Sequence, residues 1–259
     1  MKTLIYQVYT GKRSKLYDVC TASVKEYSSR IKADYIVQRH PILCIKPDVF
    51  ATNRSKESYM KYGGFLPIYE KENSFNYLKT YDQVAVIDAD VFVRESVNES
   101  IFEEAWGSEF AAVVERDMPI TEKYAQKIAN YSQMQYSNIR TVDWKWNKYG
   151  AEFMNMGVMV MSNRLLQYLK GQTPAQFLNR PRFKPFIDGM GAWKWSTDQT
   201  LLNTWIREEN MKIRNLDWKW NGLFTANEKI KKCNFVHFFL KDLLPQRGEN
   251  VEELMELIK

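Results

Sequence analysis

Cysteine is scarce in this chain of 259 residues, with three residues at Cys20, Cys44 and Cys233. They are odd in number, widely separated and show no C-x-x-C spacing. This pattern excludes a disulfide framework and a cysteine-based zinc site, and it is typical of a reducing compartment. We therefore expect a cytoplasmic protein.

Long apolar runs, linkers and dense basic stretches are also missing. No segment approaches the roughly 18 apolar residues of a membrane span, and Met1 leads directly into a short strand-like run instead of a signal-peptide core. No stretch rich in Pro, Gly or Ser divides the chain, so we expect one domain over residues 1–259. The net charge of +6 suits an anionic ligand such as a nucleotide diphosphate and does not demand nucleic acid.

Strand-like and helix-like segments alternate along the chain. Apolar runs typical of strands cover residues 3–9, 34–37, 84–87, 110–114, 157–161 and 234–239. Helical spacing of apolar residues covers 15–31, 69–78, 196–206 and 249–259. This alternation predicts an α/β fold with a largely parallel sheet, in which ligands bind beyond the carboxyl ends of the strands.

Two carboxylates follow the most apolar of these strands. Val84 to Ile87 is apolar on both sides of the strand period, and Asp88 and Asp90 come next at spacing i, i+2. In an extended chain both side chains would lie on the same side. A divalent cation between them would offset their repulsion, and carboxylate oxygens suit magnesium, manganese or calcium. The alternative is a polar turn with solvated Asp residues, but apolar residues resume at Val91, which favours the metal site.

Tryptophan and lysine alternate in three places, at residues 143–147, 193–195 and 217–221. The intervals are irregular, so this is no solenoid repeat. The alternation fits a strand with one buried side, and one or two exposed Trp faces would suit contact with a sugar. The polar, Tyr-rich segment 120–148 is expected to begin as a helix and to form a lid or an excursion that faces the acceptor.

Five short blocks occur in an order that resembles glycosyltransferase family 8, the glycogenin-like group of GT-A fold enzymes. The blocks are Leu78–Asp90, Phe153–Val158, Asp198–Asn203, Leu216–Asn221 and Phe235–Phe238. They are similar to the family's Asp-x-Asp strand, F-N-x-G-V segment, D-Q-x-x-L-N helix, L-P-x-x-Y-N strand and V-V-H-F strand. The resemblance implies a GT-A fold, a Rossmann-like nucleotide-diphospho-sugar transferase fold with a mixed, mostly parallel sheet flanked by helices.

The resemblance also implies an activity and a metal. It points to a metal-dependent, retaining hexosyltransferase that moves a sugar from a nucleotide-diphosphate sugar, a UDP-sugar, to an acceptor hydroxyl. Mn²⁺, or Mg²⁺, would be held by Asp88, Asp90 and His237, with Ala89 beside the donor. Such an ion neutralises the diphosphate as it leaves. His237 is one of two histidines, and His40 is interpreted as structural.

The family's positions near the transferred sugar fall on Asn155, Asp198 and Gln199, and we predict catalytic roles for the last two. A local explanation competes, because Ser196 to Gln199 has the spacing of a capping box. Retention is compatible with the lack of a clear second carboxylate base.

Other donor contacts follow from the same resemblance. Lys71 would approach the phosphates, and Thr10 and Tyr17 would lie near the nucleotide. Asp117 would hold sugar hydroxyls or simply close a turn. The family's H-F-x-G loop has Leu240 in place of its Gly, so Lys241 would take over part of the diphosphate contact as a point charge.

Three other functions remain open at this level. A sugar nucleotidyltransferase of related fold would need a Gly-rich phosphate loop, of which residues 10–13 are a faint echo. A non-catalytic carbohydrate-binding protein on the same fold is the second. Nucleic-acid binding rests only on the basic pI and the tryptophans, and it would show a steep salt dependence.

Overall fold

The computed structural model describes residues 1–48, 56 and 60–259. The strands are β1 (Thr3–Val8), β2 (Asp34–Gln38), β3 (Gln83–Ile87), β4 (Val91–Val93), β5 (Phe110–Val114), β6 (Met154–Ser162), β7 (Ile213–Asn215), β8 (Gly222–Leu223) and β9 (Phe235–His237). The α-helices are α1 (Lys15–Arg30), α3 (Ile101–Glu104), α4 (Glu122–Tyr136), α5 (Leu166–Leu169), α6 (Pro174–Leu178), α7 (Lys184–Asp188), α8 (Asp198–Glu208) and α9 (Val251–Ile258). The 3₁₀ helices are η1 (Pro67–Lys79), η2 (Glu115–Asp117), η3 (Asn163–Leu165), η4 (Pro181–Phe183), η5 (Gly191–Trp193), η6 (Trp218–Asn221), η7 (Ile230–Lys232), η8 (Lys241–Leu243) and η9 (Pro245–Gly248).

A six-stranded sheet in the order β2-β1-β3-β6-β5-β7 forms the centre of the molecule. β1 pairs with β2 and β3 in parallel, and β5 pairs with β7 in parallel. Only β6 in this sheet runs against its neighbours β3 and β5. The predicted mixed, mostly parallel sheet is therefore confirmed. Because β1 and β3 are parallel neighbours, the segments that follow them emerge at the same edge of the sheet.

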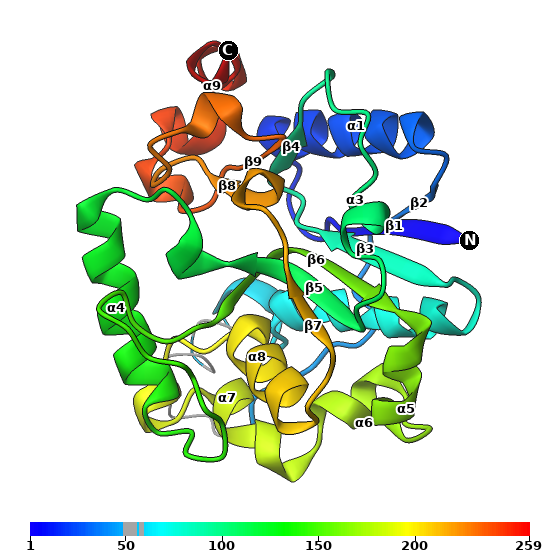
Figure 1. Ribbon diagram of the computed structural model, residues 1–259, viewed down its shortest axis with the longest axis vertical. Coiled ribbons are helices and arrows are strands. Elements are labelled where there is room, and N and C mark those ends of the chain that lie inside the picture. Colours follow the sequence, from blue (N-terminus) through cyan, green and yellow to red (C-terminus); the bar gives the residue numbers. More distant parts are fainter. Residues whose placement is uncertain (49–55, 57–59) are drawn as a thin grey trace.

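The two faces of the sheet are buried in two separate hydrophobic clusters. Successive side chains of a strand point to opposite faces, so Val84 and Val86 join one cluster while Ala85 and Ile87 join the other. Every residue of β3 is buried, as the unbroken apolar run predicted. In Figure 1, α1 lies on one side of the sheet and α7 and α8 lie on the other.

A second, three-stranded sheet in the order β4-β9-β8 lies beside the first. β4 pairs with β9 antiparallel, and β8 pairs with β9 parallel. Cys20 and Cys233 are buried beside this sheet and Cys44 is exposed, all three with free thiols. Among residues 1–48, 56 and 60–259, no helix is both long and apolar enough to cross a lipid bilayer.

Two predicted helices differ from the structure in where they begin or in their type. The helix expected from Ser196 begins at Asp198, and its N-cap is Thr197, whose side chain accepts from the backbone N–H of Gln199. The segment 69–78 is helical, but as part of the 3₁₀ helix η1. A 3₁₀ helix places side chains three to a turn, and eight of the residues of η1 are buried.

The Trp-Lys segments do not form strands. The repeat at 217–221, and with it the predicted L-P-x-x-Y-N strand, is the turn η6, and residues 143–146 are irregular. Trp144 and Trp220 are nonetheless buried, whereas Trp146 and Trp195 are exposed. Whether an indole ring is buried therefore depends on its place in a turn and not on the alternation of side chains along a strand.

Candidate metal centre

Asp88, Asp90 and His237 converge at the carboxyl end of β3. Each offers one ligand atom, and these atoms all lie within 4.8 Å of one another. His237 Nε2 is 3.3 Å from Asp90 Oδ1 and 3.9 Å from Asp88 Oδ2. The sheet pairing brings them together, because Val91 stands opposite His237 and the N–H of Phe238 donates to the carbonyl of Asp90. Two carboxylates suit both Mn²⁺ and Mg²⁺, and the added imidazole nitrogen favours Mn²⁺, because Mg²⁺ prefers oxygen ligands.

The backbone at the two aspartates is a turn, where the sequence predicted extended chain. β3 ends at Ile87, and the N–H of Val91 donates to the carbonyl of Asp88 at 3.1 Å. The turn moves the chain from the large sheet into β4 of the small sheet. Asp88 and Asp90 still meet, but they do so through this change of sheet instead of through the strand period. Ala89, between them, is buried.

Gly157 leaves the space that the imidazole occupies. A Cβ atom built on Gly157 would lie 2.3 Å from Cε1 of His237 and 2.5 Å from its Nδ1, closer than real Cβ contacts come. The carbonyl of Gly157 also accepts the N–H of Asp88 at 2.8 Å. The residue is therefore in direct contact with two of the three candidate ligands.

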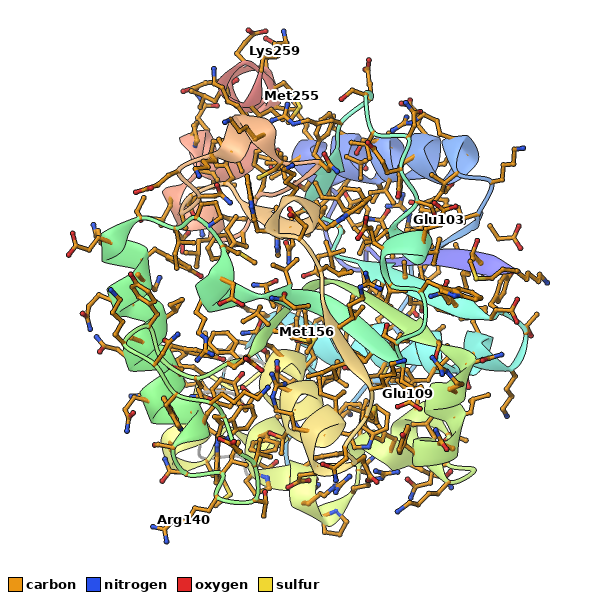
Figure 2. The ribbon with its side chains drawn as sticks, in the orientation of Figure 1. Glu103, Glu109, Arg140, Met156, Met255 and Lys259 are labelled. Atoms are coloured by element: carbon orange, nitrogen blue, oxygen red, sulfur yellow. The ribbon has the colours of Figure 1, made fainter. Side chains whose placement is uncertain are left out.

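Lys71 lies beneath this centre and joins it to α8. Its Nζ is 3.0 Å from Asp88 Oδ1 and 2.6 Å from Asp198 Oδ2, and it donates to the carbonyl of Met156 at 3.1 Å. Met156 lies near the middle of the molecule (Figure 2). Burial lowers the pKa of Lys71, but the carboxylates of Asp198 and Asp88 outweigh it, so the net shift of the pKa is upward. Lys71 is thus a buried, charged residue that contacts two carboxylates.

The charges in this cluster favour a divalent cation. Burial raises the pKa of Asp88 to about 6, although the positive charge of Lys71 lowers it in part. When ionised, Asp88, Asp90 and Asp198 carry three negative charges near the single positive charge of Lys71. A bound M²⁺ would balance the excess of two and would favour ionised Asp88. The donor set and its charge therefore fit the metal that the sequence predicted.

Asp198 and Gln199 lie at the N-terminus of α8, next to the same cluster. The side chain of Asp198 is 2% exposed and pairs with Lys71. Gln199 Oε1 accepts the N–H of Met156 at 3.3 Å, and its side chain is partly exposed. An aspartate in a first helical turn is also favoured by the helix dipole. The predicted capping box with Ser196 as N-cap is therefore wrong, because Thr197 is the N-cap and the Gln199 side chain bonds Met156 instead of the cap. The catalytic role of Asp198 stays a prediction.

Tyr17 and Lys241 lie on the other side of the aspartates. Lys241 Nζ is 3.7 Å from the centroid of the Tyr17 ring. Burial raises the pKa of Tyr17, and the charges of Asp90 and Asp88 raise it further. Thr10 follows β1 at the same edge of the sheet and is half-buried. Tyr17 and Lys241 therefore contact each other near the aspartates, and Thr10 lies at the same edge of the sheet. Contact of these residues with a nucleotide stays a prediction.

Leu240, which stands where the pattern of glycosyltransferase family 8 has glycine, has the backbone conformation that glycine favours. Its φ is 58° and its ψ is 61°, in the left-handed region. The side chain is exposed. The loop after β9 therefore keeps a glycine-like shape although the residue is leucine.

Asn155 and Asp117 are placed differently from the other predicted donor contacts. Asn155 is buried, and its side chain bonds Glu115, Asn221 and the N–H of Gly157. Asp117 is half exposed and accepts from Asn215 Nδ2 at 3.0 Å, which fits the turn-closing interpretation. Contact of either residue with a sugar stays a prediction.

Comparison with solved structures identifies the fold of this chain. The galactosyltransferase LgtC, solved with donor and acceptor sugar analogues, matches with a TM-score of 0.53 and 13% identity, over 98% of this chain and 95% of its own. Mouse xyloside xylosyltransferase 1, in its apo form, gives 0.51 and 14% identity, over 95% of this chain and 100% of its own. The bifunctional glycosyltransferase WbbM gives 0.53 and 13% identity, over 92% of this chain and 46% of its own. The chain has the GT-A fold.

No family model matches the sequence, and no curated protein matches it either. The likeness to the solved structures is therefore one of fold. The overall sequence identity is low, and this is why the resemblance found in the sequence rested on a few short motifs in the same order. In this GT-A fold, the Asp-x-Asp turn after β3 faces His237 of β9 across the small sheet.

Three buried polar residues of the GT-A domain were missed by the sequence reasoning. Asn221 accepts or donates a hydrogen bond at His237 Nδ1, Glu115 bonds Asn155, and Glu72 is fully buried beside Lys71. Asn221 ends the block Leu216–Asn221, so its position in that motif was a signal. Glu72 and Glu115 gave none, because their burial depends on tertiary packing.

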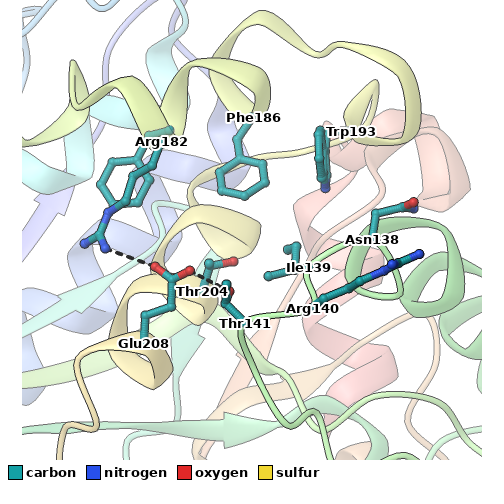
Figure 3. A pocket seen from close by; sticks show the side chains of 10 residues that line it. Asn138, Ile139, Arg140, Thr141, Arg182, Phe186, Trp193, Thr204 and Glu208 are labelled. Atoms are coloured by element: carbon teal, nitrogen blue, oxygen red, sulfur yellow. Dashed lines mark hydrogen bonds and ion pairs between the residues drawn. The ribbon is translucent and has the colours of Figure 1, made fainter.

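A cavity of about 200 Å³ lies at the far end of α8 from Asp198 (Figure 3). Trp193 and Phe186 line it with ring centroids 5.3 Å apart, and Glu208 bonds both Arg182 and Thr141. α8 has 11 residues, so its ends are about 15 Å apart at 1.5 Å per residue. The cavity is therefore separate from the metal centre.

Proposed function

We propose that this protein is a metal-dependent, retaining glycosyltransferase that moves a sugar from a UDP-sugar to an acceptor hydroxyl. The observation that carries the proposal is the convergence of Asp88, Asp90 and His237 within 4.8 Å at the carboxyl edge of a GT-A sheet. A galactosyltransferase and a xylosyltransferase share the fold. The buried negative charge beside Lys71 supports a divalent ion at this point.

Each residue of the cluster has a part in the proposed transfer. A bound Mn²⁺ or Mg²⁺ would neutralise the developing charge of the leaving diphosphate. Lys71 holds Asp88 and Asp198 in fixed positions through its two ion pairs. Lys241, over the ring of Tyr17, supplies a positive charge at the edge where the phosphates would lie.

Asp198 and Gln199 are proposed to face the transferred sugar. The carboxylate of Asp198 is held by Lys71 and faces the same cluster as Asp88, so it would stabilise positive charge that develops on the sugar ring. The partly exposed amide of Gln199 would orient a sugar hydroxyl, since its Oε1 is already fixed by the N–H of Met156.

A binding experiment tests the proposal most directly. The thermal midpoint of unfolding is measured with UDP, with Mn²⁺, with both, and with both plus a chelator. A ligand at about 100 times its Kd adds about 2.7 kcal/mol of stability, so we expect a clear rise with UDP that requires Mn²⁺. The Asp90→Asn variant should lose this rise, whereas Asp143→Asn, at an exposed position outside the candidate site, should keep it.

A second measurement then separates transfer from its rivals. Release of UDP from a UDP-sugar panel, with and without saccharide acceptors, should depend on Mn²⁺ and fall sharply in Asp198→Asn. Pyrophosphate release from UTP and a sugar phosphate would instead identify a nucleotidyltransferase. Absence of any UDP response with Mn²⁺ present would refute the proposed function.

A further inference from the structure

A chain of buried hydrogen bonds runs from the backbone of Gly157 to the ring of His237. The N–H of Gly157 donates to Asn155 Oδ1 at 2.9 Å. The same oxygen lies 2.8 Å from Asn221 Nδ2, and Asn221 Oδ1 lies 3.0 Å from His237 Nδ1. Asn155, Asn221 and His237 are all buried, so each polar atom must find its partner within the protein.

The orientation of each amide follows from the first donor. A backbone N–H can only donate, so the Asn155 atom that faces Gly157 must be the oxygen. The other atom, Nδ2, then donates to the carboxyl Oε2 of Glu115 at 2.9 Å, which is an acceptor. Because Asn155 Oδ1 also faces Asn221, the Asn221 atom there must be Nδ2, and its remaining atom Oδ1 must accept from His237.

We infer that Asn221 is a positioning residue that keeps the proton of neutral His237 on Nδ1, so that Nε2 presents its lone pair to the metal centre. The inference rests on the metal site of the proposed function. A ring nitrogen that donates to Asn221 Oδ1 must carry the hydrogen, and a neutral imidazole has only one. Nε2, which points at Asp90 and Asp88, is then the unprotonated ligand atom.

Glu115 and Tyr124 anchor the far end of the chain. Tyr124 OH donates to Glu115 Oε1 at 2.7 Å, while Glu115 Oε2 accepts from Asn155. Both carboxyl oxygens of Glu115 thereby have a hydrogen-bond donor, and Tyr124 holds the carboxyl group in place opposite Asn155 Nδ2. The tautomer of one imidazole is therefore set by a backbone amide on one side and a buried carboxyl on the other.

Partners of this kind orient metal-ligating histidines, and their loss weakens metal binding about 10- to 100-fold. Asn221→Leu removes the acceptor and keeps a similar volume, so we expect a Mn²⁺ affinity weaker by that factor. Asn221→Asp keeps an acceptor opposite Nδ1, so it should bind Mn²⁺ more tightly than Asn221→Leu, although it should lower stability because its second oxygen then faces Asn155 Oδ1. Asn227→Leu, at another buried asparagine, is the matched control and should bind normally.

The deciding readout is the ring tautomer in metal-free protein, measured by two-bond ¹H–¹⁵N NMR at alkaline pH. With two histidines in the chain, substitution of His40 assigns both rings. We expect His237 to carry its proton on Nδ1 in the unsubstituted protein and in Asn221→Asp, and to lose this preference in Asn221→Leu.

Two outcomes overturn the inference: a His237 proton on Nε2 in the unsubstituted protein, or an unchanged tautomer together with unchanged Mn²⁺ affinity in Asn221→Leu. If Asn221→Leu does not fold, the tautomer of the unsubstituted protein and of Asn221→Asp still decides. A protein that binds no Mn²⁺ but shows the Nδ1–H ring would contradict the proposed function and leave the positioning role of Asn221 supported.

Discussion

Lys71 Nζ lies 2.6 Å from Asp198 Oδ2, and this buried ion pair connects η1 to the first turn of α8. The same ammonium reaches Asp88 at 3.0 Å. The metal centre and the proposed catalytic aspartate are thus held by one side chain.

Replacing Lys71 by Met tests this connection. The variant leaves two buried carboxylates without their cation. Removing one partner of a buried ion pair typically lowers the free energy of unfolding by about 3–5 kcal/mol, and we expect a loss of this size. Urea unfolding of metal-free protein measures the loss. Lys145→Met breaks an exposed pair with Glu152 and should cost less than about 1 kcal/mol.

The double variant with Asp198→Asn should recover part of the loss, because it removes one of the stranded charges. A Lys71→Met protein as stable as the unsubstituted one would show that the ion pairs contribute nothing.

A methyl group at Gly157 should displace His237. Because the new Cβ would lie 2.3 Å from Cε1 of the ring, the imidazole must move, and we expect Gly157→Ala to weaken Mn²⁺ binding at least tenfold. Calorimetric titration with Mn²⁺ measures the affinity, and circular dichroism checks that the variant is folded. Normal Mn²⁺ affinity in a folded Gly157→Ala protein would remove His237 from the ligand set.

Metal binding should depend on pH around 6. Burial raises the pKa of Asp88 to about 6 in the metal-free protein. Burial lowers the pKa of His237, but the Asp90 carboxylate outweighs it and the net shift is upward. Because Mn²⁺ binds the deprotonated groups, its affinity should fall about tenfold or more per pH unit below 6 and level off once the pH exceeds the raised pKa of His237.

The metal-free protein should show the opposite trend in stability. A raised carboxyl pKa means that the folded state binds the proton more tightly, so this contribution to stability is lost as pH rises from about 4 towards 6. The stabilisation by Mn²⁺ should therefore be smallest at acidic pH and grow as pH rises through 6. Calorimetry and thermal unfolding between pH 4 and 8 test both trends, and a flat profile would contradict them.

Glu72 should be neutral in the folded protein. Its side chain is fully buried, its two oxygens have no hydrogen-bond partner among the described residues, and burial followed by the Asp198 charge raises its pKa well above 4.5. Its contribution to stability is therefore present at low pH and lost as pH rises above about 4.5.

Glu72→Gln keeps the shape and cannot ionise, so it should be more stable than the unsubstituted protein at pH 8 by about 1–3 kcal/mol. The difference should shrink towards pH 4.5. Urea unfolding at several pH values measures it. A difference that is constant with pH, or a variant that is less stable at pH 8, would show that Glu72 is ionised and paired in the fold.

The sequence predicted the fold and the candidate metal cluster from two different signals. The apolar run of β3 predicted a central strand followed by two carboxylates, whereas the resemblance to glycosyltransferase family 8 implied that His237 would join Asp88 and Asp90. The extended chain at 88–90 was wrong, since the N–H of Val91 turns back to the carbonyl of Asp88. Spacing alone does not reveal where a chain changes sheets.

The polar residues around the cluster depended on tertiary contacts between distant segments. Lys71 resembled an ordinary helix lysine until η1 packed it against α8, 127 residues further along the chain. Asn221 reaches His237 through the turn η6, which the Trp-Lys pattern had suggested was a strand. Such partners become recognisable only when the donors and acceptors of a buried group are accounted for one by one.

The two oxygens of Asp88 face different neighbours: Oδ1 meets Lys71, and Oδ2 turns towards His237. A carboxylate is planar and rigid, so a change in the position of one oxygen also moves the other. Binding or release of an ion at Asp88 Oδ2 would therefore shift the Lys71 ammonium and, through its ion pair with Asp198, the first turn of α8. Occupancy of the candidate metal site would then change the position of the Asp198 carboxylate without any loop having to move.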